Sequence, residues 1–141
     1  MRVRMLYALL AAAAFAVAIT ACDSSSEQVY GIGDVVDVGG DMTMTLAEAE
    51  FGDDRLEASF VIGNNGIEEG TYNLVLSLQA RDTAGSPMAQ IVPCGADLDG
   101  VVQPGEMATA GICWDTEGAQ TVRIHYLVLV FDSEIVWEVE E

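Results

Sequence analysis

Apolar and polar residues alternate one by one along most of this chain, and that period of two restricts its fold more than any other feature. Successive side chains of a β-strand point to opposite faces, so the pattern indicates strands with one face in a core and the other in solvent. The apolar positions are Met42, Met44 and Leu46; Leu56, Ala58, Phe60 and Ile62; Val122, Ile124, Tyr126, Val128 and Val130; and Ile135, Trp137 and Val139. Further strands are expected near residues 35–38, 72–80, 88–92 and 106–114. The sequence therefore predicts an all-β chain.

Glycine, proline and asparagine separate these segments. They form the turn sequences Gly39-Gly40, Asn64-Asn65-Gly66, Gly85-Ser86-Pro87 and Pro104-Gly105. Such residues supply a positive or a fixed φ where the chain reverses. Short strands at this spacing predict a two-sheet sandwich of seven to eight antiparallel strands, closed by a C-terminal hairpin.

The N-terminal residues 1–21 have the three parts of a secretory signal. Arg2 and Arg4 precede an uncharged apolar run, and small residues precede Cys22. The run is about 15 residues long, whereas a helix that spans a bilayer needs about 20. We therefore expect a helical signal peptide that is cleaved off.

The segment Ile19-Thr20-Ala21-Cys22 resembles a lipobox, in which diacylglycerol is attached to the cysteine thiol before the signal peptide is cut. The resemblance implies a lipoprotein signal peptide at 1–21 and lipidation of Cys22. The polar residues that follow predict a flexible tether at 22–29, and the alternating segments predict a sandwich domain at 30–141. It also predicts an exported protein, anchored by lipid to the cell membrane or envelope and facing outside the cytoplasm. The alternative is an ordinary secretory signal with an incidental cysteine.

Cys94 and Cys113 remain as an even pair in a chain predicted to be exported, so a disulfide between them is expected. Closing a loop of about 20 residues would stabilise the fold by about 3 kcal/mol in the chain-entropy model. A metal site on this pair is not expected, because the two cysteines are far apart in sequence and the chain has one histidine.

The chain is strongly acidic and contains no lysine. Of its five basic residues Arg2 and Arg4 lie in the signal peptide, which leaves three against 23 acidic residues and a net charge of −20. Such a surface repels phosphate backbones, which argues against nucleic acid as a partner. Two explanations stay open: carboxylates that keep the protein soluble in a saline habitat, or attraction of cations and basic partners.

Three short motifs resemble the domain-of-unknown-function family 4352. They are Gly33-Asp34-Val35-Val36, the strand that runs into Asn64-Asn65-Gly66, and Pro104-Gly105-Glu106. The resemblance covers residues 30–140 and implies a bacterial surface lipoprotein with an immunoglobulin-like, telokin-like sandwich. The family has no established activity, and this chain differs from it in its acidity and its lack of lysine.

The sequence contains no recognisable set of catalytic residues. His125 is the one histidine and lies on the polar face of a predicted strand, and no serine or cysteine lies in a triad motif. No pair of carboxylates is distinguished by its spacing. We therefore predict a domain without enzymatic activity or a cofactor.

Two metal sites are alternatives. Asp97-Leu98-Asp99-Gly100 is similar to the start of a calcium loop but lacks the closing glutamate, so an acidic hairpin is the expectation there. Thioethers and imidazole bind copper, and the candidate ligands are Met42, Met44, Met88, Met107 and His125. Met42 and Met44 share one face of a predicted strand, which favours core packing.

Together these features predict a membrane-anchored exported lipoprotein whose non-catalytic immunoglobulin-like domain binds a protein or envelope ligand. A divalent-ion or copper-binding envelope protein is the alternative.

The net charge predicts a stability that depends on salt. The Debye length shrinks from about 30 Å at 0.01 M to about 3 Å at 1 M, which weakens repulsion between carboxylates in the compact state. NaCl and KCl should raise the melting temperature gradually and alike, and Ca²⁺ should add little beyond its ionic strength. A calcium step that saturates at low concentration and disappears in the double variant Asp97→Asn, Asp99→Asn would instead establish a site there. A melting temperature that does not change with NaCl would contradict the prediction.

Overall fold

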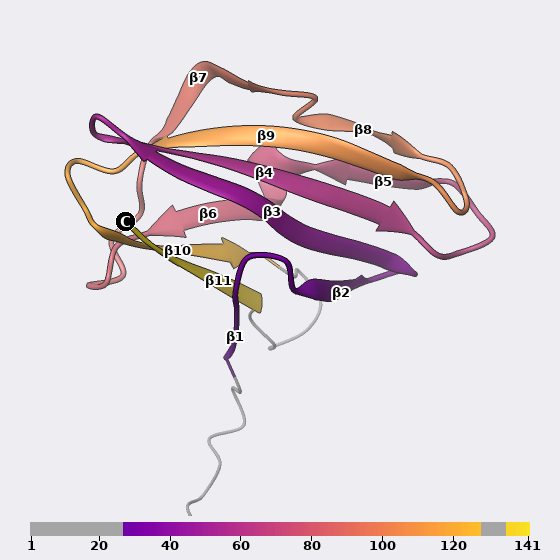
Figure 1. The fold of residues 1–141 in the computed structure, drawn as a ribbon. Helices are drawn as coiled ribbons and strands as arrows, with labels where there is room; N and C mark the ends of the chain where they lie inside the picture. Colours follow the sequence, from indigo (N-terminus) through magenta and orange to yellow (C-terminus); the bar gives the residue numbers. More distant parts are fainter. Residues whose placement is uncertain (1–26, 128–134) are drawn as a thin grey trace, which may run out of the picture.

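The computed structural model describes residues 27–127 and 135–141. The expected signal peptide, Cys22, the expected strand positions Val128 and Val130, and the expected turn of the C-terminal hairpin lie outside these residues. Two packed β-sheets form a sandwich (Figure 1). The five-stranded sheet has the order β2 (Val35–Gly39), β3 (Met42–Gly52), β4 (Arg55–Asn64), β9 (Met107–Asp115) and β7 (Gln90–Ala96). The four-stranded sheet has the order β1 (Gln28–Tyr30), β11 (Ile135–Glu140), β10 (Thr121–Tyr126) and β6 (Leu78–Arg81).

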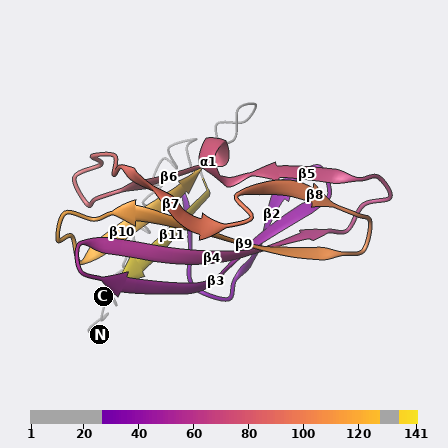
Figure 2. The ribbon, with the colours of Figure 1, turned by 90° about the horizontal axis from the view of Figure 1, so that it is seen from above.

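A small third element extends the sandwich at one end. β5 (Gly70–Asn73) and β8 (Asp99–Val102) pair as a two-stranded ribbon, seen beside the end of β4 in Figure 2. The buried amide of Asn64 joins the two parts by donating hydrogen bonds to the carbonyl oxygens of Glu68 (2.7 Å) and Val102 (2.9 Å). Its own carbonyl accepts from the backbone nitrogen of Gly66 at 2.9 Å, so the predicted Asn-Asn-Gly turn is confirmed.

The alternation read from the sequence produces the core. Along β4 every second residue from Leu56 to Ile62 is buried, and the residues between them point away from the core. In β3 a bulge between Leu46 and Glu48 shifts the phase by one, so that Ala49 and Phe51 pack on the core in place of even-numbered residues. The bulge thereby keeps the glutamates of β3 in solvent.

An aromatic pair joins the two sheets. Phe60 of β4 and Trp137 of β11 are both fully buried, and their ring centroids lie 5.3 Å apart in an edge-to-face arrangement. Such aromatic pairs add about 0.5–1.5 kcal/mol to the free energy gained from burying their area. The prediction of an all-β sandwich is confirmed.

The strands differ from the expected seven to eight in number and in one pairing. Eleven strand segments occur in the described residues, and β1 pairs with β11 in parallel, whereas the other ladders between named strands are antiparallel. The strand expected at 72–80 is interrupted by the single turn α1 (Leu74–Ser77). The side chain of Asn73 caps this turn by accepting a hydrogen bond from the backbone nitrogen of Leu76 at 3.1 Å. A local capping bond therefore separates β5 from β6.

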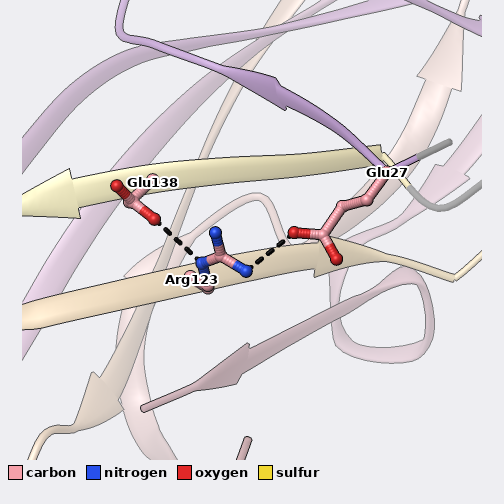
Figure 3. A network of polar contacts seen from close by, with 3 residues as sticks. All are labelled: Glu27, Arg123 and Glu138. Carbon is pink, nitrogen blue, oxygen red and sulfur yellow. Dashed lines mark hydrogen bonds and ion pairs between the residues drawn. The ribbon is translucent and has the colours of Figure 1, made fainter. Parts of the chain in front are cut away.

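The residues at the C-terminal end of the expected tether lie in the four-stranded sheet. Gln28 and Val29 belong to β1. Arg123 of β10 forms ion pairs with Glu27 (2.7 Å) and with Glu138 of β11 (2.8 Å), as Figure 3 shows. The hydrogen bond that Arg123 donates to the Glu138 carboxylate is the main cause that raises the pKa of the Arg123 guanidinium. Within the described part of the chain, no helix is long and apolar enough to span a membrane.

Candidate functional site

A groove of about 390 Å³ lies beside the disulfide, on the face of the five-stranded sheet turned away from the core. β4 contributes Glu57 and Ser59, which alternate with the buried residues of that strand. The remaining wall comes from β9 and from the chain at the end of β7. These two segments line the groove with residues that include Gly95, Asp97, Thr109 and Gly111.

The floor of the groove is made by small residues that face one another across two strands. Ser59 of β4 is paired with Gly111 of β9. Toward the disulfide, the next pair whose side chains are on this outward face is Glu57 with Cys113. Because Gly111 has no side chain, the sheet surface is left low at this point. The cross-strand register therefore creates the hollow.

Gly95 allows β7 to close one side of the groove. Its φ is +94°, and a Cβ at this position would lie 2.0 Å from the carbonyl oxygen of Gly111. The β7–β9 ladder has an irregularity between Gln90 and Gly95, after which Gly95 is paired with Ile112. The backbones can approach this closely only with glycine at position 95.

The predicted disulfide joins the same two strands. Cys94 of β7 and Cys113 of β9 are bonded, with their Cα atoms 5.7 Å apart. The carboxylate of Glu57 lies beside them: its oxygen and the two sulfur atoms are all within 4.8 Å of one another. Arg55, two residues before it on β4, forms an ion pair with Glu57 at the solvent-exposed surface. The groove thus has a carboxylate and a disulfide at one end.

Asp97 and Asp99, the calcium candidates, are both exposed at the start of the β5–β8 ribbon. Asp97 has a left-handed backbone with φ 54°, and the hydroxyl of Tyr72 donates a hydrogen bond to its carbonyl oxygen at 3.0 Å. Burial is the main cause that raises the pKa of the Tyr72 hydroxyl, and the negative charges of Asp97 and Asp99 raise it further. Within the described ranges neither aspartate belongs to a group of three potential metal-ligating side chains.

The copper candidates are distributed over different faces. Met42 and Met44 are buried in the core, where packing was expected, and Met88 packs against it. Met107 is 77% exposed on the outward face of β9, opposite Gly63. The five-stranded sheet therefore separates Met107 from Met42 and Met44.

His125 is buried, which corrects the expectation of a solvated strand histidine. It is 5% exposed and lies opposite Val136 of β11, which is also buried. The alternation correctly predicts that His125 points to the opposite face of the sheet from Ile124 and Trp137. It does not show that the face with His125 is also buried. His125 does not line the groove.

The sequence did not reveal Glu57 or Gly95 as site residues. A glutamate on a solvent-facing strand position has no distinguishing pattern, and it becomes notable only when β4 is paired with β9. The proximity of Gly95 to the predicted disulfide was the one local signal, since a glycine directly after a bonded cysteine can allow a close backbone approach.

No protein-family model matches the sequence, and no curated protein is similar to it. Solved structures are similar in fold. The yjhA protein of Bacillus subtilis has a TM-score of 0.60 at 14% identity, over 79% of this chain and 99% of its own. An uncharacterized β-sandwich protein of Clostridium difficile 630 has a TM-score of 0.57 at 10% identity, over 84% and 97%. The secreted protein MPT63 of Mycobacterium tuberculosis has a TM-score of 0.56 at 17% identity, over 82% and 100%.

At these identities the comparisons show the fold alone. The chain has an immunoglobulin-like β-sandwich fold, as the resemblance to family 4352 implied. They do not show membership in that family.

The geometry of β7 predicts that Gly95→Ala is strongly destabilising, because the new methyl group meets the Gly111 backbone in addition to the cost of the positive φ. Gly85→Ala is the matched control, since Gly85 has φ +84° with no atom within 4 Å of the added Cβ. Urea unfolding should show a loss of about 1 kcal/mol for Gly85→Ala and at least about 2–3 kcal/mol for Gly95→Ala. Equal losses would show that β7 does not approach β9 as closely as described.

Proposed function

We propose that this protein is an exported lipoprotein, anchored through diacylglycerol on Cys22, whose sandwich binds a protein or envelope ligand without catalysis. The observation that carries the proposal is the position of the groove relative to the point where the chain enters the fold. Glu27 and β1 are bound to the four-stranded sheet, whereas the groove opens on the outward face of the five-stranded sheet.

The anchor would hold the domain close to the membrane. Only residues 23–26 separate Cys22 from Glu27, and the five extended steps between these two residues reach at most about 18 Å. In Figure 1, β1 leaves the sandwich on the side of β10 and β11, while β7 and β9 lie on the other side. In this arrangement the four-stranded sheet faces the bilayer and the groove faces away from it, where a ligand has access.

Four features support export. The lipobox motif ends at Cys22. The folded domain contains a disulfide, and structural disulfides persist in oxidising compartments. One protein of similar fold is described as secreted. The resemblance to family 4352 points to the same location on the cell surface.

The groove favours binding over catalysis. Its described lining contains carboxylates, hydroxyls and backbone, and the chain's one histidine is buried elsewhere. Glu57 and Asp97 make it anionic in a domain of net charge −20. Electrostatic complementarity therefore selects neutral polar or basic ligands and disfavours anionic ones.

Lipidation is tested on the full chain expressed in a bacterial host. Mass spectrometry of the membrane fraction should find acylated Cys22 at the mature N-terminus. Cys22→Ser should leave the chain unprocessed or release it from the membrane, because two or more acyl chains are needed for stable anchoring. Ser24→Ala, two residues further along, should be acylated normally. An unmodified mature N-terminus at any other residue would refute the anchor.

Binding at the groove is tested by a photo-crosslinking residue placed at Ser59 in the anchored full chain. A discrete adduct in the envelope is expected from this site, since Ser59 lies on the groove floor. The same residue at Ala84, on the exposed turn after β6, should give no such adduct. Absence of an adduct at Ser59, or the same adduct from Ala84, would contradict the groove as the binding surface.

A further inference from the structure

Three potential metal ligands converge at one end of the groove. The Glu57 carboxylate and the Sγ atoms of Cys94 and Cys113 lie within 4.8 Å of one another. They come from three strands, β4, β7 and β9, which are neighbours in the five-stranded sheet. In the oxidised protein the two sulfurs are bonded to each other and are not available as thiolates.

We propose that reduction of this disulfide creates a Zn²⁺ site formed by Cys94, Cys113 and Glu57. A dithiol reductant supplies two electrons and two protons: its own sulfurs become a disulfide, and Cys94 and Cys113 become thiols. Zn²⁺ then binds both sulfurs as thiolates and displaces their two protons to solvent. Glu57 supplies a carboxylate oxygen as the third ligand.

The positions of the three groups suit tetrahedral zinc. Zn–S bonds of about 2.3 Å and Zn–O bonds of about 2.0–2.2 Å place neighbouring ligand atoms somewhat less than 4 Å apart. The Cα atoms of the cysteines are 5.7 Å apart, so rotation of the side chains can separate the sulfurs to this distance once their bond opens. Backbone pairing of Gly95 with Ile112 keeps β7 beside β9 in the absence of the disulfide.

The groove supplies the fourth position. Cys113 lines the same space of about 390 Å³ as Glu57, which has room for water or a ligand atom on the open side of the ion. Three protein ligands with one open position are typical of zinc sites that bind an exchangeable ligand.

The ligand types determine which ion binds. Thiolates favour Zn²⁺ over Ca²⁺ and Mg²⁺, which prefer oxygen. Glu57 must leave Arg55 to bind the ion, and this is a small cost because both side chains are about half exposed, at 50% for Arg55 and 43% for Glu57. The spacing of the two cysteines argued against a metal site, but the fold adds the third ligand that the sequence did not show.

The test uses the full chain carrying Cys22→Ser, so that the remaining thiols are those of Cys94 and Cys113. The protein is reduced with a phosphine, separated from it, and titrated with Co²⁺ as a spectroscopic probe before competition with Zn²⁺. Reduced protein should show thiolate-to-cobalt absorption that saturates at one ion per chain and is lost when Zn²⁺ is added. The oxidised protein should show no such band.

Glu57→Gln should weaken Zn²⁺ binding by about tenfold or more. Loss of even a hydrogen-bond partner of a metal ligand lowers metal affinity by about that factor, and Glu57 is a ligand itself. Glu50→Gln is the matched control: Glu50 lies opposite Glu57 on β3 and loses the same charge, but it is not a ligand. Its affinity should stay within about twofold of the unsubstituted chain, as expected for an exposed charge. If Glu57→Gln binds as tightly as Glu50→Gln, or if the oxidised protein binds equally well, the proposal is wrong.

Discussion

The register of β4 between β3 and β9 is the constraint on which both the core and the groove depend. It places Phe60 inward, where the ring packs edge-to-face on Trp137 of the opposite sheet. The same register directs Glu57 outward, opposite Cys113. A shift by one residue would exchange the two faces of β4 and remove both the inter-sheet contact and the carboxylate beside the disulfide.

Covalent and ionic contacts hold the parts that this central register does not reach. The disulfide joins the edge strand β7 to β9, where the ladder is irregular. On the other sheet Arg123 binds both Glu27 and Glu138, so one of the few cations of an acidic chain secures the strand by which the polypeptide enters the fold. The disulfide thus lies where the ladder is interrupted, and the Arg123–Glu27 ion pair lies next to β1, which is three residues long.

The acidic surface of the domain is consistent both with the proposed membrane anchor and with the proposed role of the groove. Acidic residues repel anionic headgroups, so a domain held near a bilayer would remain off its surface. The groove, turned away from the anchor in the proposed arrangement, shares that anionic character through Glu57 and Asp97. Charge therefore disfavours the membrane as the ligand of the groove and favours polar or basic partners.

The sequence by itself determined the all-β class, the inward residues of β4, the Cys94–Cys113 pair and the acidity, because alternation, cysteine number and charge are local properties of the chain. Only the tertiary structure decided that His125 is buried, that β1 pairs in parallel with β11, and that Glu57 lies beside the sulfurs. These features depend on which strands become neighbours and in what register. That choice comes from packing two sheets around one core, which no local pattern encodes.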